Sequence, residues 1–311
     1  MQTQTQTQTQ PSPTSESAVE RRRLQVERRL GDWMRARLPA VLVEFVMFGL
    51  KQAWACLFGG LTLALLIGTS LVWSDDWGLA RYDFLVLATV ALQAGFLLAR
   101  LETSAEARVI LLFHLTGTVM EVFKLHVGSW DYPEPGLLKL GGVPLFSGFM
   151  YASVGSYIAR VIRIFDMRFT AAPSLWALGA LATAIYLNFF THHVIVDLRW
   201  VLVGASLVLV RRTRVWFTVS DRERWLPLAA AAVAATVFLF AAENVGTLTG
   251  TWVYGGEGGA HWAGWSKVGS WYLLLWVSFA QVLLVFRHVL HRDDAISSTS
   301  TTGRGSARRA G

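Results

Sequence analysis

The sequence has little charge and almost no cysteine. Of its 311 residues, 16% are charged and 53% are hydrophobic, whereas soluble globular chains carry about 25% charged residues. An ordinary cytosolic enzyme is therefore not expected. The one cysteine, Cys56, lies in an apolar run, which excludes an internal disulfide and any cysteine-ligated metal cluster.

The short motifs of the commonest cofactor and hydrolase sites are also missing. The sequence contains no Walker A motif, no Rossmann glycine fingerprint, no G-x-S-x-G turn and no H-E-x-x-H pair. We therefore predict no nucleotide cofactor. The formal net charge is +7, but the basic residues stand in small groups between apolar runs, so we predict no nucleic acid partner.

Long apolar runs dominate the sequence. Windows of about 20 apolar residues predict an all-α, polytopic membrane helix bundle with eight transmembrane helices. The windows lie at residues 54–73, 82–101, 106–125, 143–164, 173–191, 194–210, 225–243 and 270–290. The predicted domains are a disordered tail at 1–17, a basic amphipathic and interfacial lead-in at 18–53, a transmembrane bundle at 54–290 and a disordered tail at 291–311.

The lysine and arginine counts predict the orientation of this bundle. With the N-terminus inside, 22 of these residues fall on the cytoplasmic side and five on the outer side. Positive charge favours the cytoplasmic side, so we expect a multi-pass protein of the cell (inner) membrane with both termini cytoplasmic. Glu44 and Lys51 are expected to form an ion pair, and Arg160 and Arg163 to reach lipid headgroups.

One motif occurs twice, E-x6-G-[ST]-W-x-Y, from Glu121 to Tyr132 and again from Glu243 to Tyr254. The offset of 122 residues between the two copies also relates the third predicted helix to the seventh, the fourth to the eighth and the first to the fifth. We therefore expect two parallel four-helix repeats about an axis along the membrane normal.

The repeat places Glu121 and Glu243 at equal depth near the outer ends of their helices. A carboxylate inside a membrane is costly unless it is paired, protonated or facing water, so both are candidate catalytic residues. If they face each other, one pKa rises, which leaves a general acid and a general base, or a cage for a divalent cation. A second interpretation stays open, in which each glutamate only holds its own loop by accepting hydrogen bonds.

Other polar side chains are predicted to gather at the same end of the bundle. His114 and Asp131 are further candidate catalytic residues, although a hydrogen-bonded structural role for His114 stays open. The candidate substrate-binding residues are Lys124, Trp130, Tyr132, Asn188, Asn244, Trp252 and Tyr254. The run N-F-F-T-H-H-V-I-V-D contains the candidate ligands of a divalent metal, which are His192, His193 and Asp197.

Several strings in the sequence carry a family resemblance. They include VEFVMFGLKQAWACLFG, FHLTGTVMEVFKLHVGSWDYPEP and GVPLFSGFMYASVGSYIAR. Over residues 41–290 the chain resembles the bacterial integral membrane family of domain of unknown function 817, which implies a polytopic membrane protein without an assigned activity.

A second, local likeness covers residues 114–150. A glutamate followed by G-x-W-x-Y and then G-V-P-L is similar to the carotenoid hydratase membrane family, which adds water to an isoprenoid end group. The likeness aligns Glu121 with that family's glutamate, whereas Asp131, Tyr132 and Pro133 replace its usual Tyr and Phe-Gly pattern.

Three functions remain open at this point. The leading hypothesis is a membrane-embedded enzyme that performs acid/base addition or hydrolysis on a lipid or isoprenoid at the outer leaflet. Its partners would be membrane lipids and an apolar small molecule. The alternatives are a small-solute or proton-coupled transporter and a non-catalytic membrane scaffold.

Overall fold

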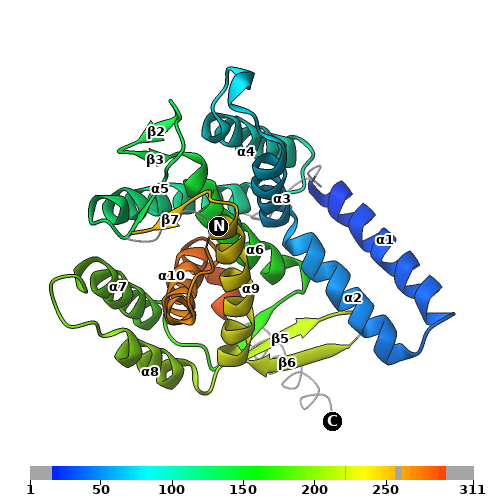
Figure 1. Cartoon of the computed structure of the whole chain (residues 1–311). Coiled ribbons are helices and arrows are strands. Elements are labelled where there is room, and N and C mark those ends of the chain that lie inside the picture. Colours follow the sequence, from blue (N-terminus) through cyan, green and yellow to red (C-terminus); the bar gives the residue numbers. More distant parts are fainter. Residues whose placement is uncertain (1–15, 221, 256–260, 292–311) are drawn as a thin grey trace, which may run out of the picture.

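The protein is described here by a computed structural model that covers residues 16–220, 222–255 and 261–291 (Figure 1). Almost all of the predicted tails at 1–17 and 291–311 lie outside these residues. The α-helices of the described part are α1 Glu16–Arg35, α2 Ala40–Ala55, α3 Leu57–Val72, α4 Arg81–Leu98, α5 Ser104–His126, α6 Phe146–Ile164, α7 Leu175–Thr191, α8 Arg199–Val210, α9 Leu228–Leu248 and α10 Val268–Val285. Helices α3 to α10 match the eight predicted helices, with ends that differ by at most five residues.

Not all of these helices are long and apolar enough to cross a membrane. Within the described residues, four pass a test of length and hydropathy, namely α4, α5, α9 and α10. Helices α2 and α3 pass it together, but they are bent by 68° at the break between them, so the number of spans rises to five at most. Helix α8 has 12 residues and is therefore about 18 Å long, well short of a hydrocarbon core of about 30 Å. The eight predicted helices are therefore present, but eight membrane spans are not confirmed.

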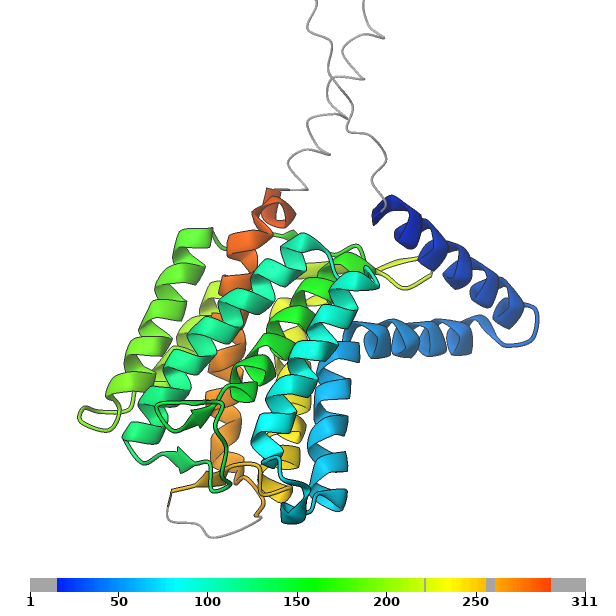
Figure 2. The ribbon, with the colours of Figure 1, turned by 90° about the horizontal axis from the view of Figure 1, so that it is seen from above.

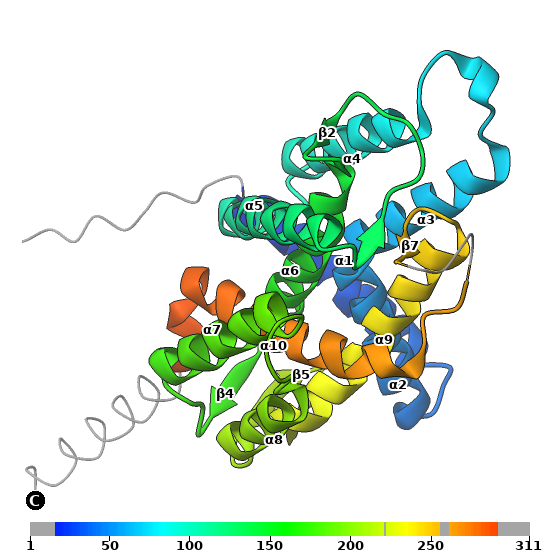
Figure 3. The same cartoon turned by 60° about the vertical axis from the view of Figure 1, so that its left-hand side comes forward.

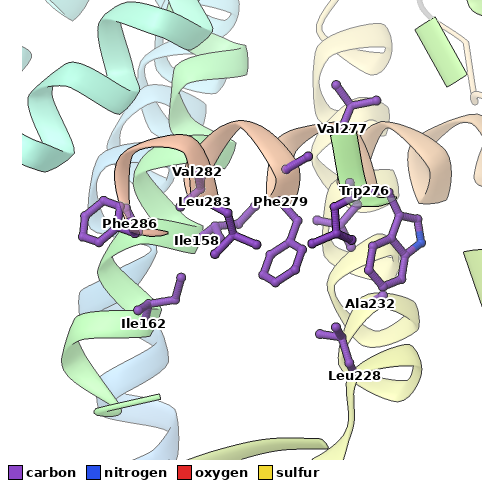
Figure 4. Close-up of a cluster of buried hydrophobic side chains, with 14 of the residues drawn as sticks. Ile158, Ile162, Leu228, Ala232, Trp276, Val277, Phe279, Val282, Leu283 and Phe286 are labelled. Atoms are coloured by element: carbon purple, nitrogen blue, oxygen red, sulfur yellow. The ribbon is translucent and has the colours of Figure 1, made fainter. Parts of the chain in front are cut away.

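Helix α10 forms the centre of the bundle. It packs against α6, α7, α8 and α9, and Trp276, Phe279 and Leu283 lie in its buried cluster with Ile158 of α6 and Leu228 of α9 (Figure 4). The outer faces of the bundle are apolar as well. Large side chains there stand almost fully exposed, for example Trp176 (90%), Leu98 (85%) and Phe238 (76%). An apolar exterior of this kind is compatible with a lipid surrounding.

Helices α1 and α2 form an arm that projects from one side of the bundle (Figure 2). The chain bends at Cys56, and next to the bend the guanidinium of Arg160 donates a hydrogen bond of 2.8 Å to the carbonyl of Trp54. Arg160 is fully buried, with the Glu102 carboxylate 3.9 Å away. The prediction that Arg160 reaches the lipid headgroups is therefore wrong, because the side chain is buried beside the bend, where it bonds to the Trp54 carbonyl and lies near the Glu102 carboxylate.

One ion pair joins the two helices of the arm, and another connects the arm to strand β6 (Glu223–Pro227). Lys51 pairs with Glu27 of α1 at 2.8 Å, and Glu44 pairs with Arg224. The predicted ion pair between Glu44 and Lys51 is therefore wrong. Seven residues along a helix bring two side chains to the same face, but in this fold each meets a nearer partner from another element.

Short strands stand at the two ends of the bundle (Figure 2). At the end next to the arm, three antiparallel strands pair in the order β4-β5-β6. At the opposite end, β1 pairs with β7 and β2 with β3, all antiparallel. The strands are β1 Trp130–Asp131, β2 Lys139–Leu140, β3 Val143–Pro144, β4 Arg168–Thr170, β5 Arg214–Thr218, β6 Glu223–Pro227 and β7 Val253–Tyr254. The pair β1 and β7 contains Trp130 of the first copy of the repeated motif and Tyr254 of the second.

Candidate functional site

The two copies of the repeated motif end their helices in the same way. Helices α5 and α9 both stop before a glycine with a positive φ, which is 69° at Gly128 and 64° at Gly250. A side chain rarely adopts this conformation, which explains the glycine. The amide after each glycine then bonds back to a carbonyl five residues earlier, from Ser129 to Lys124 at 2.9 Å and from Thr251 to Gly246 at 3.0 Å.

This turn brings each motif's tryptophan and tyrosine back onto its own glutamate. Trp130 Nε1 and Tyr132 Oη donate to Glu121 Oε2 at 2.6 and 2.8 Å. In the second copy, the donors to Glu243 Oε1 are Trp252 Nε1 at 3.0 Å and Tyr254 Oη at 2.6 Å. The spacing of nine and eleven residues between glutamate and donors is therefore a structural unit that occurs twice.

The two units meet through their strands (Figure 3). In the antiparallel pair of β1 and β7, Trp130 lies opposite Tyr254 and Asp131 lies opposite Val253. Asp131 and Val253 are equivalent positions of the two motifs, since they are 122 residues apart. An antiparallel pair in which equivalent residues face each other has a local two-fold axis between them, so the register places the two units in a symmetric arrangement.

Both carboxylates are buried, with residue exposures of 4% for Glu121 and 6% for Glu243. Within the described part of the chain, neither takes part in an ion pair, and their hydrogen-bond donors are neutral indole and phenol groups. Burial, together with the nearby Glu121 carboxylate, raises the pKa of Tyr132 well above its ordinary value. The Tyr132 phenol therefore stays protonated and serves as a donor.

The symmetry of the site is incomplete. Tyr151 of α6 donates a third hydrogen bond to Glu121, of 2.5 Å to Oε1, whereas the equivalent position in α10 is Leu273. On the other side, the Lys267 ammonium lies 3.9 Å from the centre of the Tyr254 ring. The two carboxylates thus have different surroundings, with an extra phenol at Glu121 and a cation near Glu243.

The other predicted catalytic residues lie outside this set of hydrogen bonds. Asp131 is exposed, and its carboxylate accepts from the amide of Tyr132 at 2.7 Å. The His114 ring packs 4.5 Å from the Phe149 ring, and its buried Nδ1 has no partner among the described residues. Asn244, predicted to bind substrate, accepts from the amide of Ala263 at 2.9 Å and so holds the segment before α10.

A second polar cluster joins α5 to the loop between α7 and α8. Lys124 Nζ is buried and lies 3.1 Å from His193 Nε2, and Asn188 donates to Asp197 at 3.0 Å. Burial alone would raise the pKa of Asp197, but the hydrogen bonds from Asn188 and from the Arg199 amide hold it below its ordinary value.

This cluster does not have the geometry of the predicted metal site. His192 bonds through Nδ1 to the backbone carbonyls of Asn188 and Phe189, while Asp197 pairs with Arg199 at 3.2 Å. No group of three or more His, Cys, Asp and Glu side chains that could hold one ion is present in the described residues. His192, His193 and Asp197 are therefore near one another without converging on a common point.

The sequence matches a known family over most of its length. The model of the family described as a protein of unknown function (DUF817) matches residues 44–279. The chain belongs to this family. One relative is the uncharacterized protein YoaT of Bacillus subtilis (strain 168), which is 42% identical over 241 residues that cover 76% of this chain and 89% of the relative. No solved structure matches the chain.

Two residues of this DUF817 protein complete the site and were missed by sequence reasoning. One is Tyr151, which no motif links to Glu121. The other is Arg81 at the start of α4, which is 6% exposed and pairs with Glu134, while its Nη2 donates to Thr251 Oγ1 at 3.1 Å. Arg81 therefore joins the loop after the first motif to the second motif. Its position at the start of an apolar helix was the available signal, since a charge there needs a partner.

Close packing against glycine positions two of the aromatic donors. A Cβ atom on Gly246 would lie 1.8 Å from the Trp252 ring, and one on Gly117 would lie 2.7 Å from the Tyr151 ring. Both rings therefore sit against bare helix backbone. The glycines are part of the site because only they leave room for the donors to reach the carboxylates.

Proposed function

We propose that this DUF817 protein is a multi-pass membrane protein in which Glu121 and Glu243 perform acid/base addition of water to an alkene of an isoprenoid or similar lipid. The four long apolar helices and the almost fully exposed Trp176 and Leu98 support a membrane location. The positive charge at the end with the arm supports an orientation with that end in the cytoplasm.

The observation that carries the chemistry is a pair of buried carboxyl groups, each of which accepts hydrogen bonds from a tryptophan and a tyrosine and takes part in no ion pair among the described residues. Protonation of an alkene needs a carboxylic acid in a dry site, and it produces a carbocation. Aromatic faces stabilise positive charge at short range. The site thus combines a proton source with the rings of Trp130, Tyr132 and Trp252.

The unequal surroundings of the carboxyls suggest their roles. Glu121 is buried and takes part in no ion pair among the described residues, and it is assigned the general acid because burial without a cation favours the protonated form. Glu243 is assigned the general base, since Lys267 lies against the Tyr254 ring that donates to it. In the reaction Glu121 transfers a proton to the alkene carbon, water bonds to the cation that results, and Glu243 accepts the proton that this water loses. Alkene and water are consumed, and an alcohol forms.

The test is a lipid comparison in cells that express the protein or lack it. Mass spectrometry of lipid extracts should show a product that is one water heavier than a precursor, and the precursor should accumulate without the protein. Glu121→Gln and Glu243→Gln should each lower product formation by about a hundredfold or more, which is the usual contribution of acid/base catalysis. Glu223→Gln, in an exposed strand, is the matched control and should leave the product unchanged. If the lipid profile is unaltered in both Glu121→Gln and Glu243→Gln, the proposed enzymatic activity is refuted.

Two features of the helices favour a second candidate, a proton-coupled transporter. The break of 68° between α2 and α3 and the short helix α8 resemble the interrupted helices of carriers, whose sites lie between repeats. In that case the lipid extracts stay unchanged, and proteoliposomes accumulate solute when a pH gradient is imposed. If neither the lipid profile nor solute uptake changes when Glu121 or Glu243 is replaced, the non-catalytic scaffold is the remaining alternative.

A further inference from the structure

A polar cavity lies between the arm and the bundle, at the end opposite the carboxyl pair. Its volume is about 400 Å³. The walls come from α1, from α2, from the last turn of α6 with the residues after it, and from the turn between β5 and β6. We infer that this cavity binds the phosphate group of an anionic membrane lipid.

The charge of the lining is suited to an anion. Four cationic side chains line the cavity, which are Arg28, Arg35, Lys51 and Arg163, against the two carboxylates of Glu27 and Asp166. The cavity lining itself carries more cationic than acidic side chains, and three of the cations are held in place by ion pairs, Lys51 with Glu27, Arg35 with Asp32 and Arg163 with Glu106. Guanidinium and ammonium groups are the usual partners of phosphate oxygens, since their charge-assisted hydrogen bonds are the strong ones.

Two buried polar groups mark the inner wall. The Lys51 side chain is 10% exposed and is held between Glu27 at 2.8 Å and the carbonyl of Thr218 at 3.2 Å. The hydroxyl of Ser220 is buried and has no hydrogen-bond partner among the described residues. A buried hydroxyl without a partner costs free energy, and a phosphate oxygen in the cavity would accept its hydrogen bond.

The arm favours a lipid as the source of the phosphate. Helix α2 runs at a steep angle to α3 (Figure 2), and it exposes apolar side chains such as Val41 (81%) and Phe45 (73%). A helix with such a face lies in the membrane interface with its apolar side in the acyl region. The cavity beside it is then at headgroup level, on the side where anionic lipids attract basic segments.

This inference rests on the membrane location proposed above and not on the acid/base chemistry. A failure of the lipid hydration test would leave the cavity untouched. The reverse is also true, because the β1–β7 pair next to the two carboxyl groups and the turn between β5 and β6, which lines the cavity, lie at opposite ends of the bundle (Figure 2).

The test uses the full chain in nanodiscs of phosphatidylcholine with a small fraction of phosphatidylglycerol. Native mass spectrometry then counts the phosphatidylglycerol molecules that the released protein retains. Arg28→Gln and Ser220→Ala alter the lining, whereas Arg29→Gln removes a neighbouring charge of the same helix that does not line the cavity. Arg28→Gln should weaken retention by about tenfold, the loss of one charge-assisted hydrogen bond. Ser220→Ala should weaken it less, and Arg29→Gln should leave it within about twofold, since Arg29 does not line the cavity.

Further measurements distinguish a lipid phosphate from free phosphate and control for folding. Inorganic phosphate is added to the protein in phosphatidylcholine alone, and thermal unfolding is followed. Protection by phosphatidylglycerol but not by phosphate supports the lipid, and equal protection by both shows that the cavity takes free phosphate, which overturns a lipid site. Equal loss of retention in Arg28→Gln and Arg29→Gln indicates surface charge only and also overturns it. Arg28→Lys, which keeps the charge, should restore most of the retention. Thermal unfolding of Arg28→Gln in phosphatidylcholine alone should match that of the natural protein, which shows that this variant folds.

Discussion

Gly246 offers a direct test of how the second carboxyl site is built. The residue lies in α9, three positions after Glu243, and the Trp252 ring packs on its bare backbone. An added Cβ would lie 1.8 Å from the nearest ring carbon. Atoms in contact lie about 3.5–4.0 Å apart, so Gly246→Ala forces the ring to move. The same ring donates to Glu243 at 3.0 Å, and the movement therefore breaks this bond.

The magnitude follows from three effects. Extra volume in a packed site costs about 1–3 kcal/mol. Loss of a hydrogen bond to a charged group costs about 1.5–3 kcal/mol. Alanine favours the helix by up to about 1 kcal/mol relative to glycine, which offsets part of the cost. We expect Gly246→Ala to lower the free energy of unfolding by about 2–4 kcal/mol.

The assay is reversible denaturant unfolding of the purified protein in mixed micelles, followed by tryptophan fluorescence. Gly179→Ala in α7 is the matched control, because no atom lies within 4 Å of the position of its Cβ. This variant should gain up to about 1 kcal/mol. If Gly246→Ala is as stable as the control and its fluorescence is unchanged, Trp252 does not pack on the helix as described.

Two further predictions concern ion pairs. Glu106→Ala should lower the free energy of unfolding by about 2–4 kcal/mol, because the Glu106 side chain is fully buried, caps α5 through the amide of Thr103 and accepts from Arg163 at 2.9 Å. Glu223→Ala should lower it by less than about 1 kcal/mol, because the ion pair of Glu223 with Arg168 is exposed. Equal losses in denaturant unfolding would contradict the stronger role of the buried pair. The hydrogen bond from Arg168 lowers the pKa of Glu223 in the folded protein. The pair therefore stabilises the protein at a pH above the pKa of an unfolded glutamate, about 4.3. This stabilisation is lost as the pH falls through the lower pKa of the folded state. The protection of the β4 amides, measured as their hydrogen-exchange rate relative to that of a free peptide at the same pH, should therefore fall at acid pH in the natural protein, and a pH profile of protection that is identical in Glu223→Gln would refute this.

Local sequence was enough to predict the helices and the motif. Apolar runs define α3 to α10 because helix formation depends on neighbouring residues. The two motifs were also readable, since Trp130 and Tyr132 lie nine and eleven residues after Glu121, and one glycine turn brings them back. The number of spans was less predictable, because α8 is too short and α2 bends away from α3.

Partners from distant segments could not be predicted in the same way. Tyr151 reaches Glu121 from another helix, and Arg81 reaches Thr251 across 170 residues of sequence. The partner of Lys51 was mispredicted for the same reason. Its position on the helix predicts an ion pair with Glu44, whereas the folded chain places Glu27 next to it. Many side chains are chemically suitable partners for a charge, and only the packing of helices decides which one is near.

The sequence by itself therefore determined a helical chain with apolar surfaces and two glutamates, each followed by its own tryptophan and tyrosine. Tertiary structure alone decided that β1 and β7 pair with Asp131 opposite Val253, and that the arm closes a basic cavity against the bundle. The physical reason is the range of the interactions. Periodicity and turns act over a few residues, whereas strand pairing and cavities depend on how distant segments pack together.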